Sequence, residues 1–378
     1  MTTILIAGGG TGGHVFPMVA VGQALRHLRP DVEVVYVGTG RGLESTVVPR
    51  QGGRLELLDV LPLRGGGVAG FARGGWRAAM VLPQARALVK RLNPDVVFSV
   101  GGYAAGPVTL VARSLGVPVT LLEPNSVSGF TNRLLRPLVQ RAYVGFPETA
   151  RGFDAAKVRL TGVPLRSRFA AAPYAAAAPP RLLVMGGSLG AQALNEALPR
   201  AIKNCVEAGV SLSVVHQTGR DKDGAVRALY QQLSLCEQVE VKPFIDDVAA
   251  ALADSQLVVE RAGAGALAEL CAVGRPAILI PYPYAADDHQ WFNAKSLGDD
   301  GAAVCVRQTE ADVARLTDEL LRLLQDADLR ARMAQKSARR GRPDAAADIA
   351  RDLLSLADAP AAGTAMGATV AHLWELSL

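Results

Sequence analysis

Residues Thr3–His14 have the sequence TILIAGGGTGGH, and this pattern indicates the fold class. Its first part, Thr3–Ala7, is an apolar, β-forming run that predicts a buried parallel strand. The glycine run Gly8–Gly13 predicts a tight turn into a helix, because apolar residues then recur at helical spacing from Val15 to Leu28. A strand, a glycine turn and a helix in this order are typical of the first unit of a doubly wound α/β sheet.

The same alternation continues along the chain and then starts again. The strand Arg181–Met185 opens the second half and is followed by the glycine turn Gly186–Gly190 and a helix. Further strands are predicted at residues 32–37, 96–100, 117–122, 142–144, 211–216, 239–241, 257–259 and 277–280. The predicted fold class is therefore α/β, with two Rossmann-like, doubly wound parallel-sheet domains facing across a cleft.

The chain has 378 residues, about twice the ordinary size of one domain. We predict an N-terminal domain over residues 1–163, a C-terminal domain over residues 164–356 and a flexible tail over residues 357–378. The segment Ala170–Pro180 holds three prolines and seven alanines, so it cannot form a core strand and is predicted to be a linker region.

Composition and charge exclude several classes of protein. Apolar residues make up 49% of the chain and charged residues 20%, which excludes general disorder. The formal net charge is only +5, yet the stretch Val60–Pro94 holds six basic residues and no acidic one. Aromatic residues make up 5%, fewer than a nucleic-acid binder of this kind usually carries. The charge pattern therefore predicts a local anionic partner and no nucleic acid.

The four cysteines and the start of the chain also limit the interpretation. The cysteines are far apart and form no CxxC pair, which favours reduced thiols over a disulfide framework or a zinc site. No basic segment precedes the first strand, as a signal peptide would require, and the long uncharged run Val96–Ala112 is interrupted by glycine and proline. We expect a soluble protein, or one that lies on a membrane.

The first glycine loop matches the dinucleotide-binding pattern GxGxxG at Gly8, Gly10 and Gly13. A dehydrogenase also needs an acidic residue after the second strand to hold the ribose, and here that strand leads into the segment Gly38–Arg41, which has none. Arg41 could meet a 2′-phosphate, so an NADP oxidoreductase stays open as an alternative. His14, in the first helical turn, is a candidate general base, or else it only caps the helix or packs on a neighbour.

Three segments of the second half have the residue types of a sugar-nucleotide site. The turn Gly187–Gly190 offers backbone N–H groups at a helix start, where anions bind. The turn Arg261–Gly265 leads into a helix with Glu269, whose carboxylate could accept both ribose hydroxyls, although an ordinary solvated glutamate would look the same. The run Asp287–Gln290 has no second histidine nearby, which favours polar contacts to a sugar over metal ligation.

Taken together, these motifs resemble those of the MurG family, the peptidoglycan N-acetylglucosaminyltransferases. They occur in the family's order from residue 4 to about residue 345. The matching segments are Gly9–Pro17 (GGTGGHVFP), Gly101–Tyr103 (GGY), Gly129–Asn132 (GFTN), Gly162–Arg166 (GVPLR), Gly186–Ala191 (GGSLGA), Phe244–Asp247 (FIDD), Arg261–Ala264 (RAGA) and Asp288–Gln290 (DHQ).

The resemblance implies a GT-B fold and an inverting transfer that needs no metal and no cofactor. N-acetylglucosamine would move from UDP-N-acetylglucosamine to the muramoyl 4-hydroxyl of lipid I, forming lipid II for peptidoglycan synthesis. It implies a peripheral enzyme on the cytoplasmic face of the cell membrane. Its expected partners are the donor, the undecaprenyl-diphosphate-linked acceptor, anionic lipids of the inner leaflet and other cell-wall synthesis proteins.

The resemblance also assigns roles to single residues. His14 would be the catalytic base. The donor-binding residues would be Thr11, Gly12, Gly13, Asn125, Arg166, Ser188, Ile245, Ala264, Glu269, His289 and Gln290. Of these, Ile245 would meet uracil, Glu269 the ribose, and His289 and Gln290 the sugar. The acceptor and membrane side would include Tyr103, Asn132, Arg73, Trp76 and Arg77. A solvated loop and helix packed on the core would explain the basic stretch equally well.

The chain departs from the family pattern at a few positions. The family usually shows His-Glu-Gln-Asn where this chain has Leu122–Asn125 (LEPN), and a threonine where this chain has Ala266. Each lost neutral hydrogen bond would weaken binding by about 0.5–1.5 kcal/mol. Besides the NADP oxidoreductase, two alternatives to the transferase stay open. One is a UDP-N-acetylglucosamine 2-epimerase-like enzyme, which would share the two-domain fold. The other is a sugar-nucleotide-binding protein whose catalysis these losses have weakened.

Overall fold

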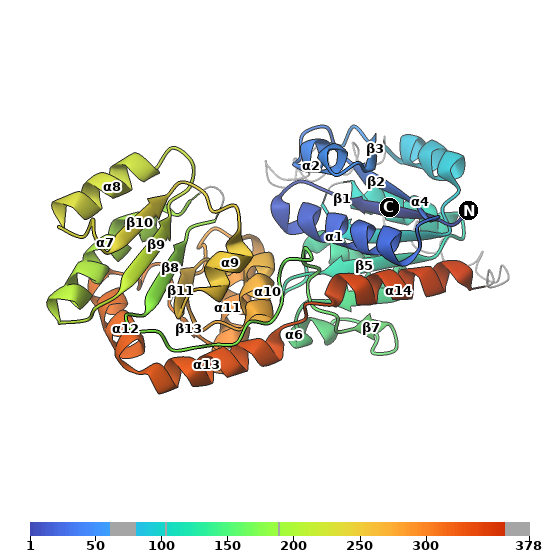
Figure 1. The fold of residues 1–378 in the computed structure, drawn as a ribbon. Helices are drawn as coiled ribbons and strands as arrows, with labels where there is room; N and C mark the ends of the chain where they lie inside the picture. Colours follow the sequence, from blue (N-terminus) through green and yellow to red (C-terminus); the bar gives the residue numbers. More distant parts are fainter. Residues whose placement is uncertain (61–80, 103, 188–189, 360–378) are drawn as a thin grey trace. The chain divides into compact units, whose positions relative to one another are not determined.

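The computed structural model describes residues 1–60, 81–102, 104–187 and 190–359 of the chain. It divides into two compact units (Figure 1). The first unit comprises Met1–Pro124, Ser128–Arg166 and the chain from Asp344 on, and the second comprises Asn125–Val127 and Ser167–Pro343.

The first unit is built on a parallel sheet with the strand order β3-β2-β1-β4-β5-β6-β7. Its strands are β1 (Thr3–Gly8), β2 (Glu33–Gly38), β3 (Arg54–Leu57), β4 (Val96–Gly101), β5 (Val119–Glu123), β6 (Arg141–Val144) and β7 (Val158–Arg159). The order reverses direction between β1 and β4. Ligands of doubly wound sheets bind at such a point, beyond the carboxyl ends of the strands.

Helices cover both faces of this sheet. Ile4 and Ile6 of β1 lie in an apolar cluster with one set of helices, whereas Leu5 and Ala7 lie in a second cluster on the opposite face, and all four are fully buried. A strand buried on both faces reads as a continuous apolar run. The helices are α1 (Gly12–Leu28), α2 (Glu44–Arg50), a helical stretch over residues 81–92, α4 (Ala105–Ser114), α5 (Phe130–Leu135), α6 (Pro147–Ala150) and α14 (Ala345–Asp358).

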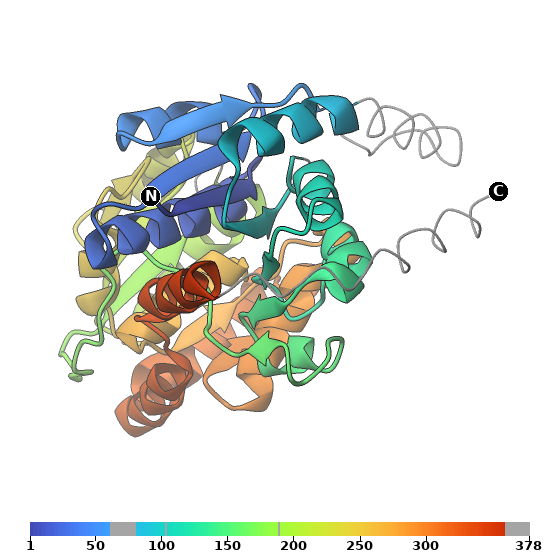
Figure 2. The ribbon, with the colours of Figure 1, turned by 90° about the vertical axis from the view of Figure 1, so that its right-hand side faces the viewer.

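The last of these helices, α14, belongs to the first unit, and Figures 1 and 2 draw it beside α1. Its residues Ile349 and Leu353 are fully buried in the cluster that also holds Leu25 of α1. The hydroxyl of Tyr143 on β6 donates a 2.7 Å hydrogen bond to Asp352. The sequence-based boundary, which gave residues 344–356 to the C-terminal domain, therefore differs from the division in the structure, because the apolar face of this helix is buried against the first sheet.

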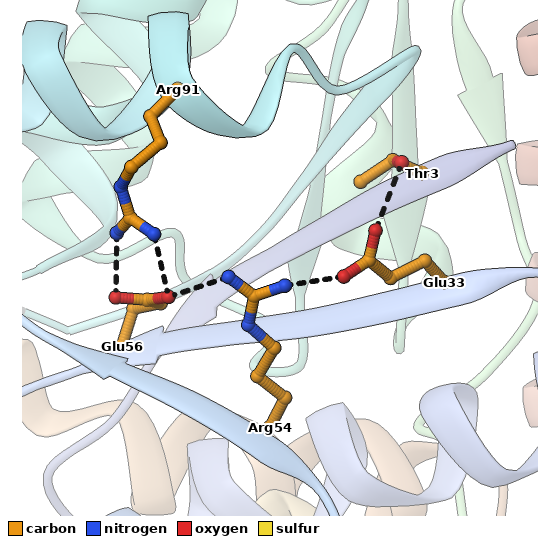
Figure 3. Close-up of polar contacts among 5 residues, drawn as sticks. All are labelled: Thr3, Glu33, Arg54, Glu56 and Arg91. Atoms are coloured by element: carbon orange, nitrogen blue, oxygen red, sulfur yellow. Dashed lines mark hydrogen bonds and ion pairs between the residues drawn. The ribbon is translucent and has the colours of Figure 1, made fainter. Parts of the chain in front are cut away.

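A chain of ion pairs, ending in a hydrogen bond, crosses β3, β2 and β1 of the first sheet (Figure 3). Arg91, on the helical stretch 81–92, donates to both carboxylate oxygens of Glu56 on β3, at 2.8 and 3.3 Å, and holds the pKa of Glu56 below its ordinary value. Arg54 bridges Glu56 and Glu33, and the hydroxyl of Thr3 donates to Glu33. Exposed pairs of this kind add at most about 1 kcal/mol each. One of the six bases of the stretch Val60–Pro94 is thus already paired within the protein.

The second unit repeats the plan with the parallel strand order β10-β9-β8-β11-β12-β13. The strands are β8 (Arg181–Met185), β9 (Ser213–Gln217), β10 (Val239–Lys242), β11 (Leu257–Glu260), β12 (Ala277–Leu279) and β13 (Ala303–Cys305). The helices are α7 (Gln192–Glu207), α8 (Asp223–Gln232), α9 (Val248–Ala253), α10 (Ala264–Val273), α11 (His289–Asp299), α12 (Val313–Gln325) and α13 (Ala327–Arg340). Its switch point lies between β8 and β11.

The predicted linker region carries no helix or strand over residues 167–180, and it is held on the second unit by two arginines. Arg275 is 1% exposed and donates to the carbonyls of Ala172, Leu252 and Ala253, at 2.6–3.0 Å. Arg330 donates to the hydroxyl of Tyr174 at 3.2 Å. Backbone carbonyls thus satisfy a buried guanidinium and fix where the linker runs.

The fold class predicted from the sequence, two Rossmann-like parallel-sheet domains, is confirmed. The strands that the sequence did not predict are β3, β7 and β13, which all lie at sheet edges. β3 and β7 contain charged residues and have no buried residue, so they lack the apolar run of a central strand, whereas β13 is apolar but only three residues long. Among the helices in the described ranges, none combines the length and the apolarity needed to cross a bilayer.

Candidate active site

The predicted base, His14, is the third residue of α1 and lies at the carboxyl edge of the first sheet. The carbonyl of Thr11 accepts the backbone N–H groups of His14 and Val15, both at 3.1 Å, and so starts the helix. A Cβ atom placed on Gly101, at the end of β4, would lie 3.2 Å from Nε2 of His14. The imidazole thus rests against a glycine at the switch point between β1 and β4, and it is half-buried.

A buried carboxylate, not identified from the sequence, binds a backbone N–H of the glycine loop beside His14. Glu44, the first residue of α2, is fully buried and accepts the backbone N–H of Gly10 at 2.8 Å. Its other oxygen accepts the backbone N–H and the hydroxyl of Thr39, at 2.9 and 3.0 Å. In a dinucleotide-binding fold a loop N–H of this kind faces the pyrophosphate. Here a side chain of the protein occupies it, which disfavours the NADP alternative.

The other predicted donor residues of the first unit lie on or near α1. Thr11 is the N-cap residue of α1, and Gly12 and Gly13 are its first two residues. Arg166 is exposed, and its guanidinium lies 5.2 Å from the centre of the Phe16 ring, also on α1. Arg166 therefore clusters with the first unit, together with His14.

The departures at Leu122 and Pro124 surround a buried carboxylate at the end of β5. Glu123 is 1% exposed and accepts the backbone N–H of Gly129 and the amide of Asn132, both at 2.9 Å. Asn132 is 5% exposed and also donates to the carbonyl of Leu122. Leu122 is fully buried in the core cluster beneath α1 and α14. Its side chain therefore packs in the core, and Asn132 fixes the turn between β5 and α5.

In the second unit, the turn after β11 and the start of α10 lie at the switch point. Ala264 is the first residue of α10, and the backbone N–H groups of a helix start favour a phosphate. Glu269 is half-buried farther along α10. Arg261 uses its guanidinium within the protein, donating to the carbonyls of Ile280 and Pro281 and to Gln308, at 2.7–3.2 Å.

A second carboxylate, Glu260, lies at the end of β11 and was not identified from the sequence. It is 1% exposed, and its Oε1 atom has no hydrogen-bond partner in the described part of the chain. Burial, together with the negative charge of Glu269, raises the pKa of Glu260 to about 8. The carboxyl group of Glu260 thus keeps its proton up to about pH 8, at the end of the strand that leads to the helix of Glu269.

The predicted sugar-contacting residues, His289 and Gln290, begin α11. Nδ1 of His289 lies 2.7 Å from the carbonyl of Ala286, and Oε1 of Gln290 accepts the backbone N–H of Tyr282 at 2.9 Å. The carboxylate of Asp288 forms an ion pair with Arg307 at 3.2 Å, so it is already engaged within the protein. In the described ranges, no three side chains of His, Cys, Asp or Glu come together as a metal site would require.

Asn293, one turn farther along α11, connects the segment at residues 125–126 with the turn before α10. It is fully buried, and its Oδ1 accepts the backbone N–H and the hydroxyl of Ser126, at 2.8 and 2.9 Å. Its amide donates to Oδ1 of Asn125 at 3.1 Å and to the carbonyl of Ala262 at 3.2 Å. The predicted donor residue Asn125 is thereby tied to the turn that leads to Ala264.

The predicted uracil-binding residue, Ile245, lies three residues beyond β10 and is 6% exposed. The carboxylate of Asp247 accepts the backbone N–H of Ala250 at 3.0 Å and caps α9. Five predicted site residues lie outside the described residues: Arg73, Trp76, Arg77, Tyr103 and Ser188.

Comparisons with known proteins define the class of this chain. The N-terminal domain model of glycosyltransferase family 28 matches residues 4–144, and the C-terminal domain model of the same family matches residues 181–349. The fold and the two matches together make the chain a family 28 glycosyltransferase of the GT-B type.

A relative from Sorangium cellulosum is 61% identical over 95% of this chain and 90% of its own length. It is named UDP-N-acetylglucosamine--N-acetylmuramyl-(pentapeptide) pyrophosphoryl-undecaprenol N-acetylglucosamine transferase. A crystal structure of MurG from Acinetobacter baumannii is 32% identical, with a TM-score of 0.80, over 94% of this chain and 100% of that one. The chain belongs to the MurG family.

A more distant structural likeness concerns one of the alternatives. A UDP-GlcNAc 2-epimerase from Neisseria meningitidis, solved with UDP-GlcNAc bound, has a TM-score of 0.67 over 94% of this chain and 100% of that one. Its sequence identity is 13%, so the likeness extends to the fold alone. The epimerase alternative is not favoured.

Proposed function

We propose that this chain transfers N-acetylglucosamine from UDP-N-acetylglucosamine to the muramoyl 4-hydroxyl of lipid I, an undecaprenyl-diphosphate-linked acceptor, and so produces lipid II. The observation that carries the proposal is the 61% identity, over 95% of the chain, to a relative named for this transfer. Domain models of one glycosyltransferase family on both halves support it.

The second unit would hold the donor. Glu269 would accept the ribose hydroxyls, and the start of α10 at Ala264 would face the diphosphate with its N–H groups. Ile245 would meet the uracil with its backbone, and His289 and Gln290 would contact the sugar. Asn293 supports this arrangement, because its four hydrogen bonds tie Asn125 to the turn before α10. Ser188, which lies outside the described residues, and Arg166, which clusters with the first unit, would add contacts to the diphosphate.

The first unit would hold the acceptor and the base. His14 would take the proton of the acceptor 4-hydroxyl while the oxygen attacks the anomeric carbon of the donor sugar. The bond from that carbon to the diphosphate breaks in the same step, UDP leaves as an anion, and the anomeric configuration inverts. A single displacement needs one base and a stabilised leaving group, which agrees with one histidine and a helix start. Tyr103 and Asn132 would lie on the acceptor side.

The same unit would rest on the cytoplasmic face of the cell membrane. The stretch Val60–Pro94 carries six bases and no acid, and Arg86 and Lys90 in its described part are exposed. Val81, Ala85 and Leu88 on the same helix are buried in the core. The apolar side chains that meet lipid would therefore come from the part before residue 81, which holds Trp76.

Release of UDP separates this function from the alternatives. Purified protein is incubated with UDP-N-acetylglucosamine, with and without a short-chain lipid I analogue. We expect UDP release that depends on the analogue, together with a disaccharide product. Formation of UDP-N-acetylmannosamine, with no dependence on the analogue, would indicate an epimerase. Donor binding without any turnover would indicate a sugar-nucleotide-binding protein.

A further inference from the structure

The buried carboxylate of Glu44 organises the glycine loop in front of His14. Its three hydrogen bonds, of 2.8–3.0 Å, come from Gly10 in the loop and from Thr39 just after β2. A backbone hydrogen bond also joins the glycine loop to the start of α2: the N–H of Leu43 donates to the carbonyl of Gly10 at 3.1 Å. Both carboxylate oxygens act only as acceptors, so each matches the N–H that faces it.

The glycines around Glu44 fit this side chain closely. A Cβ atom would lie 2.3 Å from Oε1 if placed on Gly9, 2.4 Å from Cγ if placed on Gly38, and 2.0 Å from Oε2 if placed on Gly42. Carbon and oxygen atoms without a bond do not approach so closely. Gly10 has a φ of +99°, a left-handed backbone that directs its N–H to the carboxylate at little cost only in glycine. The sequence of the loop is therefore matched to the glutamate.

The opposite side of the loop meets the end of β4. A Cβ atom on Gly102 would lie 2.5 Å from the carbonyl oxygen of Gly9, and one on Gly101 would lie 3.2 Å from Nε2 of His14. The loop is thus held between Glu44 and the segment that also supports the imidazole. Gly10 lies only four residues before His14, so a displacement of the loop there would move the start of α1 and the imidazole.

We propose that Glu44 is a positioning residue for the transfer: it fixes the loop Gly8–Gly13 and thereby sets where His14 meets the acceptor hydroxyl. This inference rests on the proposed function, in which His14 is the base. Placement matters because a displacement of about 1 Å in a catalytic group can reduce the rate about 100-fold. Glu44 itself, fully buried behind the loop, would touch neither substrate.

The main test compares Glu44→Gln with the wild type. The amide presents an NH₂ group to one of the two N–H donors, so that hydrogen bond is lost while the volume is kept. We expect kcat to fall about 10-fold to 100-fold, with the KM for UDP-N-acetylglucosamine within about twofold. Unchanged kcat, or an equal rise in donor KM, would overturn the proposal. Thr39→Val, which removes only the hydroxyl, is a milder variant and is expected to lose about threefold or less in kcat.

Two glycines between β2 and α2, Gly40 and Gly42, provide a matched pair of control variants. Gly42→Ala would drive a methyl group into Oε2 of Glu44, whereas an alanine at Gly40 meets no atom within 4 Å. We expect Gly42→Ala to lower kcat as Glu44→Gln does and Gly40→Ala to keep wild-type kcat. Equal activity in the two alanine variants would contradict the proposed fit.

A double-mutant cycle with His14→Ala separates positioning from general damage. If Glu44 acts through His14, adding Glu44→Gln to His14→Ala lowers kcat by less than about twofold further. A full additional loss would show that Glu44 acts elsewhere and would overturn the proposal. If His14→Ala alone keeps wild-type kcat, the assignment of the base fails, whatever the result for Glu44.

Discussion

Glu269 on α10 can be tested by a single substitution. Glu269 is the predicted ribose ligand, and a carboxylate that accepts two hydroxyls contributes about 1.5–3 kcal/mol to binding. Glu269→Ala is therefore expected to raise the KM for UDP-N-acetylglucosamine about 10-fold to 100-fold. The matched control is Glu310→Ala, an exposed glutamate of the same unit, with donor KM within twofold. Similar donor KM values in the two variants would contradict the ribose assignment.

Glu260, the buried neighbour of Glu269, gives a prediction about pH. Burial raises its pKa in the folded protein to about 8, from an ordinary value of 4.5. The unfolded chain loses this proton near pH 4.5 and the folded chain keeps it to about pH 8. The stability that the group contributes is therefore present below pH 4.5 and is lost as the pH rises to about 8.

Urea unfolding of Glu260→Gln and the wild type at pH 5, 6.5, 8 and 9 tests this titration. Glutamine stays neutral, so the free energy of unfolding of the variant relative to the wild type should rise from pH 5 to pH 8 and then level off. A difference that does not change with pH would mean that Glu260 titrates normally in the folded protein.

The residues of the site differ in how far the sequence could identify them. His14 follows a distinctive glycine run, so its place at the start of a helix could be predicted. Glu44 could not be, because it lies 30 positions farther along the chain and only the fold brings it to Gly10. Asn293 was missed for the same reason, since its partners at residues 125 and 126 are far away in sequence. The close fit of Gly9, Gly38 and Gly42 around Glu44 can be recognised only in the folded structure.

Among the elements of the described sheets, the central strands were all predicted, whereas of the four edge strands only β10 was. Apolar runs such as Leu182–Val184 identify strands that are buried on both faces. The edge strand Arg54–Leu57 alternates charged and apolar residues, but it is only four residues long and none of them is buried, so it lacks the apolar run of a central strand. Helix α14 shows a related limit: its spacing predicts an apolar face, but spacing alone does not say which sheet that face covers.

Helix α14 gives a prediction about stability. Leu353 is fully buried against the first sheet, and its truncation leaves a cavity in the cluster that contains α1. Leu353→Ala is expected to lower the free energy of unfolding of the first unit by about 2–5 kcal/mol. Ser355→Ala, an exposed position on the same helix, should change it by less than about 0.5 kcal/mol. Urea denaturation of the two variants and the wild type checks both values. Equal losses of unfolding free energy in the two variants would contradict the packing of α14.

At the scale of the whole molecule, the small net charge hides a local excess of bases in one unit. Changing Arg73, Trp76 and Arg77 together to alanine is expected to reduce sedimentation with anionic vesicles several-fold, since each base near such a surface contributes about 1 kcal/mol. The KM for UDP-N-acetylglucosamine should stay within twofold. The control variant removes Arg332 and Arg339, two exposed bases of α13 in the second unit, and should sediment like the wild type. Equal sedimentation of both variants would contradict membrane binding through this stretch.

The proposed reaction transfers N-acetylglucosamine, with His14 as the base and the donor held by the second unit. Its most direct test follows labelled N-acetylglucosamine from saturating UDP-N-acetylglucosamine onto a lipid I analogue, in the wild type and in His14→Ala. We expect a labelled disaccharide from the wild type, at least about 100-fold slower formation by the variant, and equal donor affinity in both. No labelled disaccharide from the wild type, or equal rates in the two proteins, would contradict it.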